Sequence, residues 1–456
     1  MGLFGIMSIA EQSLAAQQEG LQVTANNIAN VNTAGYTRRV ADLAEQAPFS
    51  ANIGAAGGGG VTLQQVQAIR DNVLEIRLNQ ETSNQNRLTS LQQQLGPVES
   101  LFSAQTGAGL STAVDNFFSA LQQLSTNPTN GAQRQSVITA AQTMAQTFNQ
   151  VANGISQQIQ GANQYIVQDL SQVNNLTTQI AKLNGQIASL QDVSGNTAAL
   201  VDQRTGLVRK LSQLMDFNIS DGGNNQVTLT TSGGQELVSG MQAIPLTLQP
   251  NGSVQDIYSG ATNITSTIAG GSLAGLITVR DTALPNLASQ LNSLATTLAQ
   301  GVNTQNALGF DLNSNPGGNL FVPPTATNAA ANMVLATTDP ARIAASSSST
   351  NSGDNSNLLA MINLQQTPNA SGLTPDAAYA AMVSTIGSLV QGANTQQQAS
   401  QAVLTQLQNQ RASVSGVSMD EESINLQQFQ QAYQAAARVV TVIDKLTTLA
   451  INLGQD

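Results

Sequence analysis

One continuous helical pattern between residues 141 and 190 constrains the fold of this chain more than any other feature. Apolar residues recur there at alternating four- and three-residue spacing, which is typical of a helix that packs along a narrow stripe. A helix through these roughly 50 residues would be about 75 Å long. The chain is therefore predicted to form a rod rather than a compact globule. The stripe has one polar break, at Asp169, and otherwise consists of Ala141, Ala145, Phe148, Ala152, Ile155, Ile159, Ala162, Ile166, Val173, Leu176, Ile180, Leu183, Ile187 and Leu190.

Both ends of the chain carry a similar stripe, with the spacing of a coiled-coil seam, the apolar contact line between two helices. An isolated helix of this length is marginal in water, and the nearest partner for each end is the other end. We therefore predict a terminal coiled coil, with Phe429 and Tyr433 as core residues rather than an aromatic binding site. The seams are Leu3, Met7, Ala10, Leu14, Gln17, Leu21, Thr24, Ile28 and Val31, and Leu426, Phe429, Tyr433, Ala436, Val440, Ile443, Thr447 and Ala450.

The surface left on such a narrow two-helix element is rich in Gln, Ala and Asn and carries few charges. A surface of this kind suits packing against copies of the same chain. Repeated head-to-tail contacts build rings or helical tubes.

Between about residues 217 and 280 the spacing of apolar residues changes from helical to alternating. The segment "QVTLTT" alternates, "SGGQ" predicts a turn, and "IPLTLQPNGSVQDIYS" predicts two strands around a Pro-Asn-Gly turn. Helical spacing precedes this block and returns with Leu284, Leu287, Leu291, Leu294 and Leu298. The block is therefore interpreted as a β domain inserted into a helical one, and we expect it to lie farthest from the terminal helices.

The predicted fold is mainly α with an inserted β domain: a terminal coiled coil formed by both chain ends, an elongated helical rod domain and an outer antiparallel β domain. Thr374 and Pro375 predict the cap and first residue of a late rod helix that ends near residue 412. The predicted domains are 1–40 and 417–456 for the two coiled-coil halves, 41–216 and 281–416 for the two parts of the rod, and 217–280 for the β domain.

The stretch "ANNIANVNTAGYTRR", residues 25–39, concentrates amides at the end of the first predicted helix. Asparagine competes with the helix for backbone hydrogen bonds, so this stretch is compatible with a helix stop. Amides also donate and accept, so these side chains could bond to a neighbouring subunit without burying charge. Both interpretations stay open for Asn26, Asn27, Asn30 and Asn32.

Composition excludes several classes of function. The 456-residue chain contains no His, Cys or Trp, which removes imidazole and thiolate metal sites and every His- or Cys-dependent triad. Its net charge of −11 argues against nucleic acid and against an anionic membrane surface. No apolar run approaches the ~20 residues of a membrane span. We expect no cofactor, metal, catalytic residue or membrane insertion, and composition alone suggests a cytosolic protein.

Other local motifs have simple structural interpretations. The start "MGLFGIMSIAEQ" lacks the basic leader of a secretory signal. "GAAGGGG" (54–60) is predicted to be a flexible loop, because Val61 follows where a phosphate-binding loop needs Lys. Ser418 and Glu421 fit a helix capping box, and the acids at 420–422 complement the helix dipole rather than bind a metal.

Two motifs resemble those of a known family. "ANNIANVNTAGYTRR" resembles the N-terminal motif of bacterial flagellar rod, hook and hook-associated proteins. "SGVSMDEESINLQQFQQAYQAAARVVTVIDKLTTLAINL" resembles the C-terminal signature of the hook-associated members that form the hook–filament junction. The continuation Gly35-Tyr36-Thr37-Arg38 and the segment "FQQAYQAAARV" favour a junction member. Together the motifs cover about the first 40 and last 40 residues.

The resemblance implies a structural adaptor, not an enzyme, which is exported by the flagellar type III apparatus without a cleaved signal. That places it outside the cell, at the hook–filament junction, and replaces the cytosolic interpretation. The implied partners are copies of itself, hook protein, the next hook-associated junction protein and an export chaperone. The expected assembly interface comprises Leu14, Leu21, Asn26, Asn27, Ile28, Asn30, Asn32, Gly35, Tyr36, Leu426, Phe429, Tyr433, Val440 and Ile443.

Three alternatives remain at this point. Hook or distal rod protein of the same family would differ in its position in the flagellum. A type III translocator would need a long apolar segment. A cell-wall hydrolase would need paired carboxylates in a cleft, and the candidate acids of the β block are Asp216, Asp221, Glu236 and Asp256.

Overall fold

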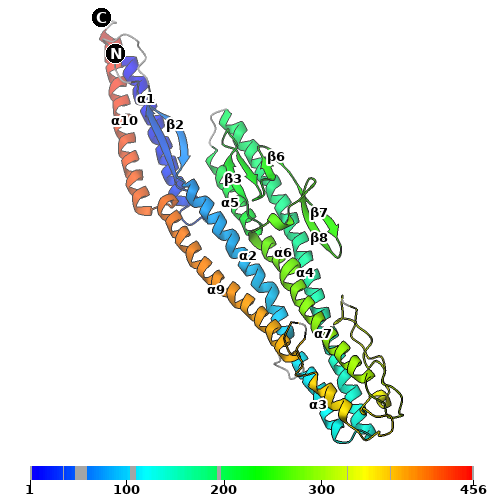
Figure 1. Cartoon of the computed structure of the whole chain (residues 1–456). Coiled ribbons are helices and arrows are strands. Elements are labelled where there is room, and N and C mark those ends of the chain that lie inside the picture. Colours follow the sequence, from blue (N-terminus) through cyan, green and yellow to red (C-terminus); the bar gives the residue numbers. More distant parts are fainter. Residues whose placement is uncertain are drawn as a thin grey trace.

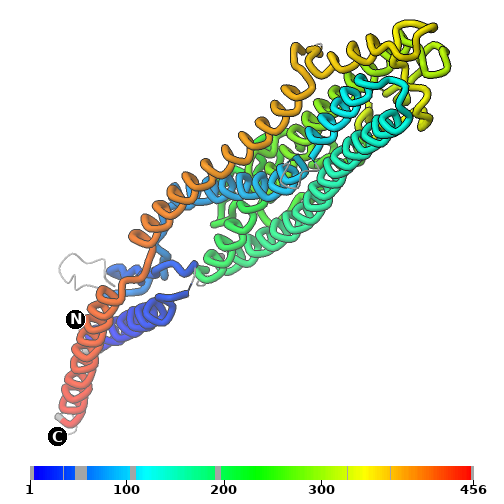
Figure 2. Tube along the Cα trace, turned by 90° about the horizontal axis from the view of Figure 1, so that it is seen from below, coloured from blue at the N-terminus to red at the C-terminus, as the bar shows by residue number. Residues whose placement is uncertain are grey.

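The protein is elongated, and both chain termini lie at one end (Figure 1). Seen from a second direction, the terminal helices continue the long axis beyond the thicker helical body (Figure 2). The computed structural model describes residues 3–33, 35–46, 59–102, 109–192, 197–325, 327–369 and 371–453. Most of the predicted loop 54–60 lies outside these ranges. None of the described helices combines the length and apolar character that a membrane span requires.

The two ends of the chain pair as predicted. Helices α1 (Leu3–Ala29) and α10 (Met419–Leu453) run antiparallel and side by side (Figure 1). Gly20 of α1 lies directly against the ring of Phe429, since a Cβ atom at Gly20 would come within 2.6 Å of that ring. The absence of a side chain at residue 20 therefore lets the two helices approach closely.

A β hairpin, which the sequence pattern did not predict, covers a second side of α1. Strands β1 (Arg39–Glu45) and β2 (Val61–Ala68) pair antiparallel and pack on that helix. Because of this cover, Ala16 and Val23 are buried although they lie outside the predicted seam. The prediction of one narrow stripe on this helix is therefore incomplete.

The rod consists of two helical layers that meet at its far tip. Helices α2 (Asn72–Phe102) and α9 (Pro375–Ser415) form the stem next to the terminal helices (Figure 1). The Thr374 hydroxyl caps α9 by accepting from the backbone N–H of Ala377 at 3.3 Å, as predicted. The tip contains α3 (Leu110–Thr126), the start of α4 (Gly131–Asp192), the end of α7 (Leu284–Ala307), the short segment η3 (Pro340–Arg342) and α8 (Ser356–Asn363).

Helix α4 is the predicted long helix, and its stripe forms the core of the rod. Phe148, Ile155, Ile166, Val173 and Ile180 are all buried, while Leu190 near the helix end is exposed. The first half of α4 packs in one core cluster with α3 and α7, and the second half packs in another with the β block.

The inserted β block contains two antiparallel sheets. The first has the order β3-β4-β5-β6 and the second β7-β8-β9. The strands are β3 (Asn218–Asp221), β4 (Val227–Thr230), β5 (Glu236–Ser239), β6 (Gln242–Ala243), β7 (Leu246–Asn251), β8 (Val254–Ser259) and β9 (Thr262–Asn263). Helix α5 (Ala198–Leu214) precedes them, and η1 (Thr265–Thr267), α6 (Gly271–Thr278) and η2 (Val279–Ala283) follow.

The position of the β block differs from the expectation. It lies beside the second half of α4, closer to the terminal helices than the tip is (Figure 1). The reason is the path of the chain: α2 and α3 lead out to the tip, and α4 returns from it. An insertion that follows α4 therefore starts near the inner end of the rod.

Asparagine side chains on helices hold several non-helical segments in place. Each of four asparagines binds both the N–H and the C=O of one backbone residue, as a neighbouring strand would. The pairs are Asn27 with Arg39, Asn174 with Leu246, Asn184 with Val227, and Asn303 with Phe321.

Asp169 interrupts the apolar stripe of α4 and has no cationic partner among the described residues. It accepts a hydrogen bond from the Ser272 hydroxyl at the start of α6. Burial raises the pKa of the Asp169 carboxyl group, and the bond from Ser272 offsets this only in part.

Replacing this carboxylate by an amide is expected to stabilise the rod at neutral pH. A raised folded-state pKa favours the fold while Asp169 is protonated, and that contribution is lost as the pH rises through the folded-state value. We expect the Asp169→Asn variant to unfold about 1 °C higher than wild type at neutral pH, a small shift because solvent screens the group. Thermal unfolding at a series of pH values measures the difference in unfolding temperature between the two proteins. The two proteins should converge below the ordinary carboxyl pKa, and a difference independent of pH would contradict the explanation.

Candidate assembly site

A cluster of charged side chains joins the terminal helices to the rod. Six of the eight ion pairs found among the described residues lie in this region, although the chain as a whole is only 9% charged. The cluster contains residues from α1, the segment after it, β1, α2, α5, α9 and α10. We call it the charged junction, and it consists of Asn27, Tyr36, Arg38, Arg39, Arg70, Glu75, Asp202, Arg209, Arg411, Glu421 and Glu422.

Asn27 is the centre of the junction and is only 1% exposed. Its amide nitrogen donates to the carbonyl of Arg39 at 2.8 Å and to Glu422 at 3.1 Å. Its oxygen accepts from the Tyr36 hydroxyl at 2.9 Å and from the backbone N–H of Arg39 at 3.0 Å. These four bonds use both amide hydrogens and both acceptor positions of the side chain. Asn27 thus connects α1, β1 and α10 inside one subunit.

Arg38 joins the segment after α1 to the first turn of α10. Its guanidinium group pairs with Glu422 at 2.8 Å and with Glu421 at 2.9 Å. Its backbone N–H donates to the carbonyl of Ser415 at 2.9 Å, at the end of α9. Glu422 is 2% exposed, so this buried carboxylate depends on Arg38 and Asn27 for compensation.

The predicted capping box at Ser418 is only half formed. The Ser418 hydroxyl accepts from the backbone N–H of Glu421 at 3.4 Å. The side chain of Glu421 extends to Arg38 instead of returning to the helix start. The acids at the start of α10 therefore hold the junction together, a role that the local sequence did not indicate.

Asp202 and Glu75 extend the network into the rod. Asp202 of α5 pairs with Arg39 at 3.0 Å and also with Arg70. Glu75 of α2 pairs with Arg209 at 3.0 Å and with Arg411 at 2.5 Å.

Two pKa values in the network are shifted. Burial raises the pKa of Glu75, but hydrogen bonds and charges from Arg411 and Arg209 outweigh it, so the net pKa is lowered. The pKa of Tyr36 is raised, mainly by burial, and the nearby Arg39 guanidinium opposes this rise. The guanidinium lies 5.1 Å from the centre of the Tyr36 ring.

The other predicted site residues range from buried to exposed, and most are half-buried. Ile443 is buried, whereas Tyr433 is 37% exposed, so it is not the core residue that the spacing suggested. Gly35, Asn26 and Asn32 are exposed. The half-buried residues are Leu14, Leu21, Ile28, Asn30, Leu426, Phe429 and Val440.

The four asparagines of the stretch 25–39 therefore differ in whether they end the helix, bond inside the subunit or stay available to a neighbouring subunit. Asn30 donates to the carbonyl of Asn26 at 2.9 Å and accepts from Thr33, which ends the helix locally. Asn27 is used inside the subunit. Asn26 and Asn32 keep their side chains on the surface, where contact with a neighbouring subunit stays a prediction.

Gly35 turns the chain between α1 and the junction with a positive φ of 86°. A Cβ atom there would meet nothing within 4 Å, so the requirement for glycine is conformational and not steric. We expect Gly35→Ala to destabilise the junction locally by about 1 kcal/mol. Hydrogen exchange at Arg38 and Arg39 should become faster. Gly96→Ala inside α2, where a Cβ also meets nothing, is the matched control and should not weaken the fold.

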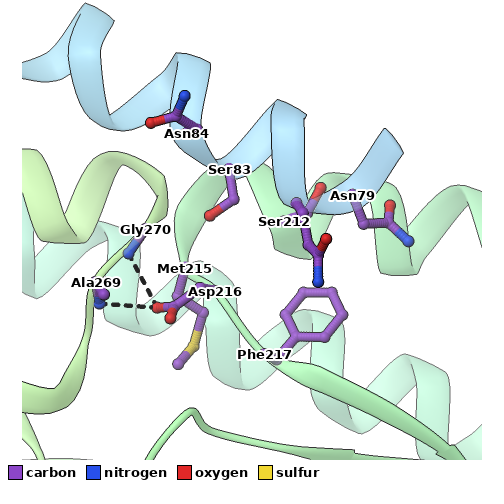
Figure 3. Close-up of a pocket in the computed structure, with 10 residues that line it drawn as sticks. Asn79, Ser83, Asn84, Ser212, Met215, Asp216, Phe217, Ala269 and Gly270 are labelled. Atoms are coloured by element: carbon purple, nitrogen blue, oxygen red, sulfur yellow. Dashed lines mark hydrogen bonds between the residues drawn. The ribbon is translucent and has the colours of Figure 1, made fainter. Parts of the chain in front are cut away.

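Two of the acids proposed for a hydrolase, Asp216 and Asp256, accept hydrogen bonds from neighbouring groups. Asp216 lies beside a small cavity of about 150 Å³, and of the described residues that line it Asp216 alone carries a carboxyl group (Figure 3). It accepts from the backbone N–H groups of Ala269 and Gly270, each at 3.0 Å. Asp256 accepts from Asn251 and Asn263. Within the described ranges, no three His, Cys, Asp or Glu side chains are grouped so that they could hold a metal ion.

Three family models match the chain. The model described as "Flagellar hook-associated protein FlgK helical domain" matches residues 95–321. "Flagella basal body rod protein" matches 7–37, and "Flagellar basal body rod FlgEFG protein C-terminal" matches 408–453. The two terminal matches contain the α1 and α10 parts of the charged junction.

Full-length relatives agree with these matches. The chain is similar to "Flagellar hook-associated protein 1" of Escherichia coli (strain K12), with 28% identity over 98% of this chain and 99% of that protein. It is equally similar, at 28% identity, to the protein of the same name from Bacillus subtilis (strain 168), over 98% of this chain and 97% of that protein. The solved structure of the flagellar hook junction protein FlgK from Burkholderia pseudomallei has the same fold. Its TM-score is 0.68 at 20% identity, over 75% of this chain and all of that one.

Proposed function

Because this chain belongs to the flagellar hook-associated protein 1 family, we propose that it is a structural adaptor that self-assembles at the junction between hook and filament. The observation that carries this proposal is the pairing of the two chain ends. Helices α1 and α10 form a narrow element at one end of the molecule, joined to the rod through the charged junction (Figure 1). A two-helix element of this kind has little core of its own and gains stability from neighbours.

The charged junction fixes the orientation of the two terminal helices relative to the rod. Arg38 and Asn27 hold the start of α10, and Arg39 holds β1 to α5 through Asp202. The terminal helices can then pack with copies of the chain while the rod points away from them. An adaptor needs both features, since its terminal helices must pack with the structures on either side of it.

The middle of the chain favours a junction protein over hook or distal rod protein. The terminal matches are to rod-type families, whereas the match over 95–321 is to the helical domain of the hook-associated protein. The proposed partners are therefore copies of this chain, hook protein and the next hook-associated junction protein, with an export chaperone before assembly. The proposed route is type III export without a cleaved signal, to a position outside the cell.

Localisation in the flagellum tests the function. In a strain that lacks this protein, the full chain with an epitope in the exposed β7–β8 turn at Gly252 should restore filaments. Immunogold labelling should mark a short collar between hook and filament. Label along the hook or in the rod would support the alternative family members, and filaments that form without the protein would contradict the adaptor function.

A further inference from the structure

A cavity of about 600 Å³ lies between the charged junction and the β block. Its described wall comes from β2, the start of α2, α5 and the β3–β4 hairpin. Small-molecule sites in proteins have volumes of about 300–1,000 Å³. Exposed residues such as Gln67 and Asp221 belong to the wall, so the cavity opens to solvent. It is therefore large enough and accessible enough for a small ligand.

Arg204 of α5 presents a free edge of its guanidinium group to this cavity. The residue is only 5% exposed, and no described carboxylate lies within ion-pair distance of it. Its Nη1 donates to Asn184 at 2.9 Å and to the carbonyl of Asn225 at 2.6 Å. Its Nε and Nη2 donate to no described residue, and both stay accessible from the cavity. These two nitrogens form the edge that binds two oxygens of a carboxylate or phosphate at once.

Arg70 brings a second positive charge to the same cavity. Its side chain is 13% exposed and pairs with Asp202, and its Nη1 donates to the Thr205 hydroxyl at 3.4 Å. Its Nε is buried and has no partner within the described ranges. Burial and the charge of Arg70 lower the pKa of Arg204 to about 10, and the charge of Asp221 opposes this shift. The two guanidinium groups therefore repel each other across a space that contains no described anion.

The surroundings of the cavity do not compensate this charge. Glu75 is already shared by two arginines, and so is Asp202. Water in the cavity would satisfy the free N–H groups of Arg204 but would leave an excess of positive charge, although the whole chain has a net charge of −11. The described cavity wall and the ion pairs joined to it contain five arginines and three carboxylates: Arg39, Arg70, Arg204, Arg209 and Arg411, and Glu75, Asp202 and Asp221.

We propose that this cavity binds a small oxyanion, a phosphate or carboxylate compound, on the Nε–Nη2 edge of Arg204 with Arg70 beside it. The cavity volume leaves room for an organic part next to the anionic group. The bound anion connects α5 with the segment that leads into α2, and so holds the β block against the stem. This inference concerns the single chain and does not depend on assembly at the hook–filament junction.

Thermal unfolding of the purified full-length chain tests the site. Inorganic phosphate and citrate are the probes, and chloride at equal ionic strength is the reference. The unfolding temperature should rise by about 2 °C or more and level off near a hundredfold excess over Kd. Salts that act only by exclusion from the protein surface give a rise without saturation.

Isothermal titration calorimetry should find one site per chain for the anion that responds. A response to phosphate alone assigns the site to phosphate compounds, and a response to citrate alone assigns it to carboxylates. If neither anion gives a saturable response, the proposal is wrong.

A built-in carboxylate supplies a second test. Thr205 lines the cavity and accepts from Arg70, so Thr205→Glu places a negative charge where the anion is proposed to bind. This variant should unfold at a higher temperature than wild type in chloride and should lose the saturable response. Thr205→Gln has the same size without the charge, and its Kd should stay within about twofold of wild type. Equal responses from the two variants would overturn the proposal. Arg204 itself is left unchanged, because its bonds to Asn184 and Asn225 also support the β block.

Discussion

Phe429→Glu is expected to abolish filament growth while leaving the rod folded. The Phe429 ring of α10 lies directly against Gly20 of α1. A carboxylate at this position would lose solvent without gaining a cation, which costs about 2 kcal/mol or more. The paired element has little other core, so this loss should separate α1 from α10. Filament counts by electron microscopy and thermal unfolding of the purified protein measure the two effects.

Gln428→Glu is the matched control for this change. This substitution adds the same charge at residue 428, the neighbouring position of α10, which is exposed. Its filaments should be close to wild type in number. If Phe429→Glu assembles normally, the ring does not support the pairing of α1 with α10 as described. A large drop in the unfolding temperature of the rod would show that the terminal helices and the rod are not independent.

Arg134→Met should lower the stability of the rod by about 3 kcal/mol or more. Arg134 at the start of α4 is 1% exposed, and it has no carboxylate in ion-pair distance among the described residues. Its guanidinium group instead donates to four carbonyls: Pro128 at 2.7 Å, Ile343 at 2.8 Å, Pro340 at 3.2 Å and Ala341 at 3.4 Å. Burial lowers the pKa of Arg134, and the charge of Asp311 opposes this shift.

Methionine keeps much of the volume of Arg134 but donates no hydrogen bond, so these carbonyls would lose the bonds that the guanidinium group supplies. Urea unfolding should show the lower midpoint, and brief proteolysis should cut near residues 340–343 first. Arg87→Met is the control, because Arg87 is half-buried and, among the described residues, its side chain donates only to Asn84 on its own helix. If both variants lose the same stability, the hydrogen bonds from Arg134 to these carbonyls do not explain the loss.

The long helices follow from local patterns. The stripe from Ala141 to Ile187 predicts α4 because one face of a helix must remain apolar along its whole length to be buried. The Leu series from Leu284 to Leu298 predicts α7 for the same reason, and all five leucines are buried. Turn residues likewise predict the β7–β8 hairpin, where Gly252 has a positive φ of 60°.

The charged junction could not be predicted in this way. Asn27 and Glu422 are 395 residues apart, and neither has a local signal that points to the other. In the sequence Glu422 is one of three acids that suit a helix start, and Asn27 is one of four amides at a helix end. Burial distinguishes them from their neighbours, and burial depends on which elements meet in space.

The sequence by itself therefore determined the long helices, the pairing of the chain ends and the presence of an inserted β block. Each of these depends on spacing along the chain, which repeats with the period of the local structure. The tertiary structure alone decided where the β block lies, which of the four asparagines is buried, and how Arg38, Arg39 and Glu422 connect the terminal helices to the rod. Those features follow from the return of α4 along the rod and from the need to compensate polar groups wherever the packed helices exclude water.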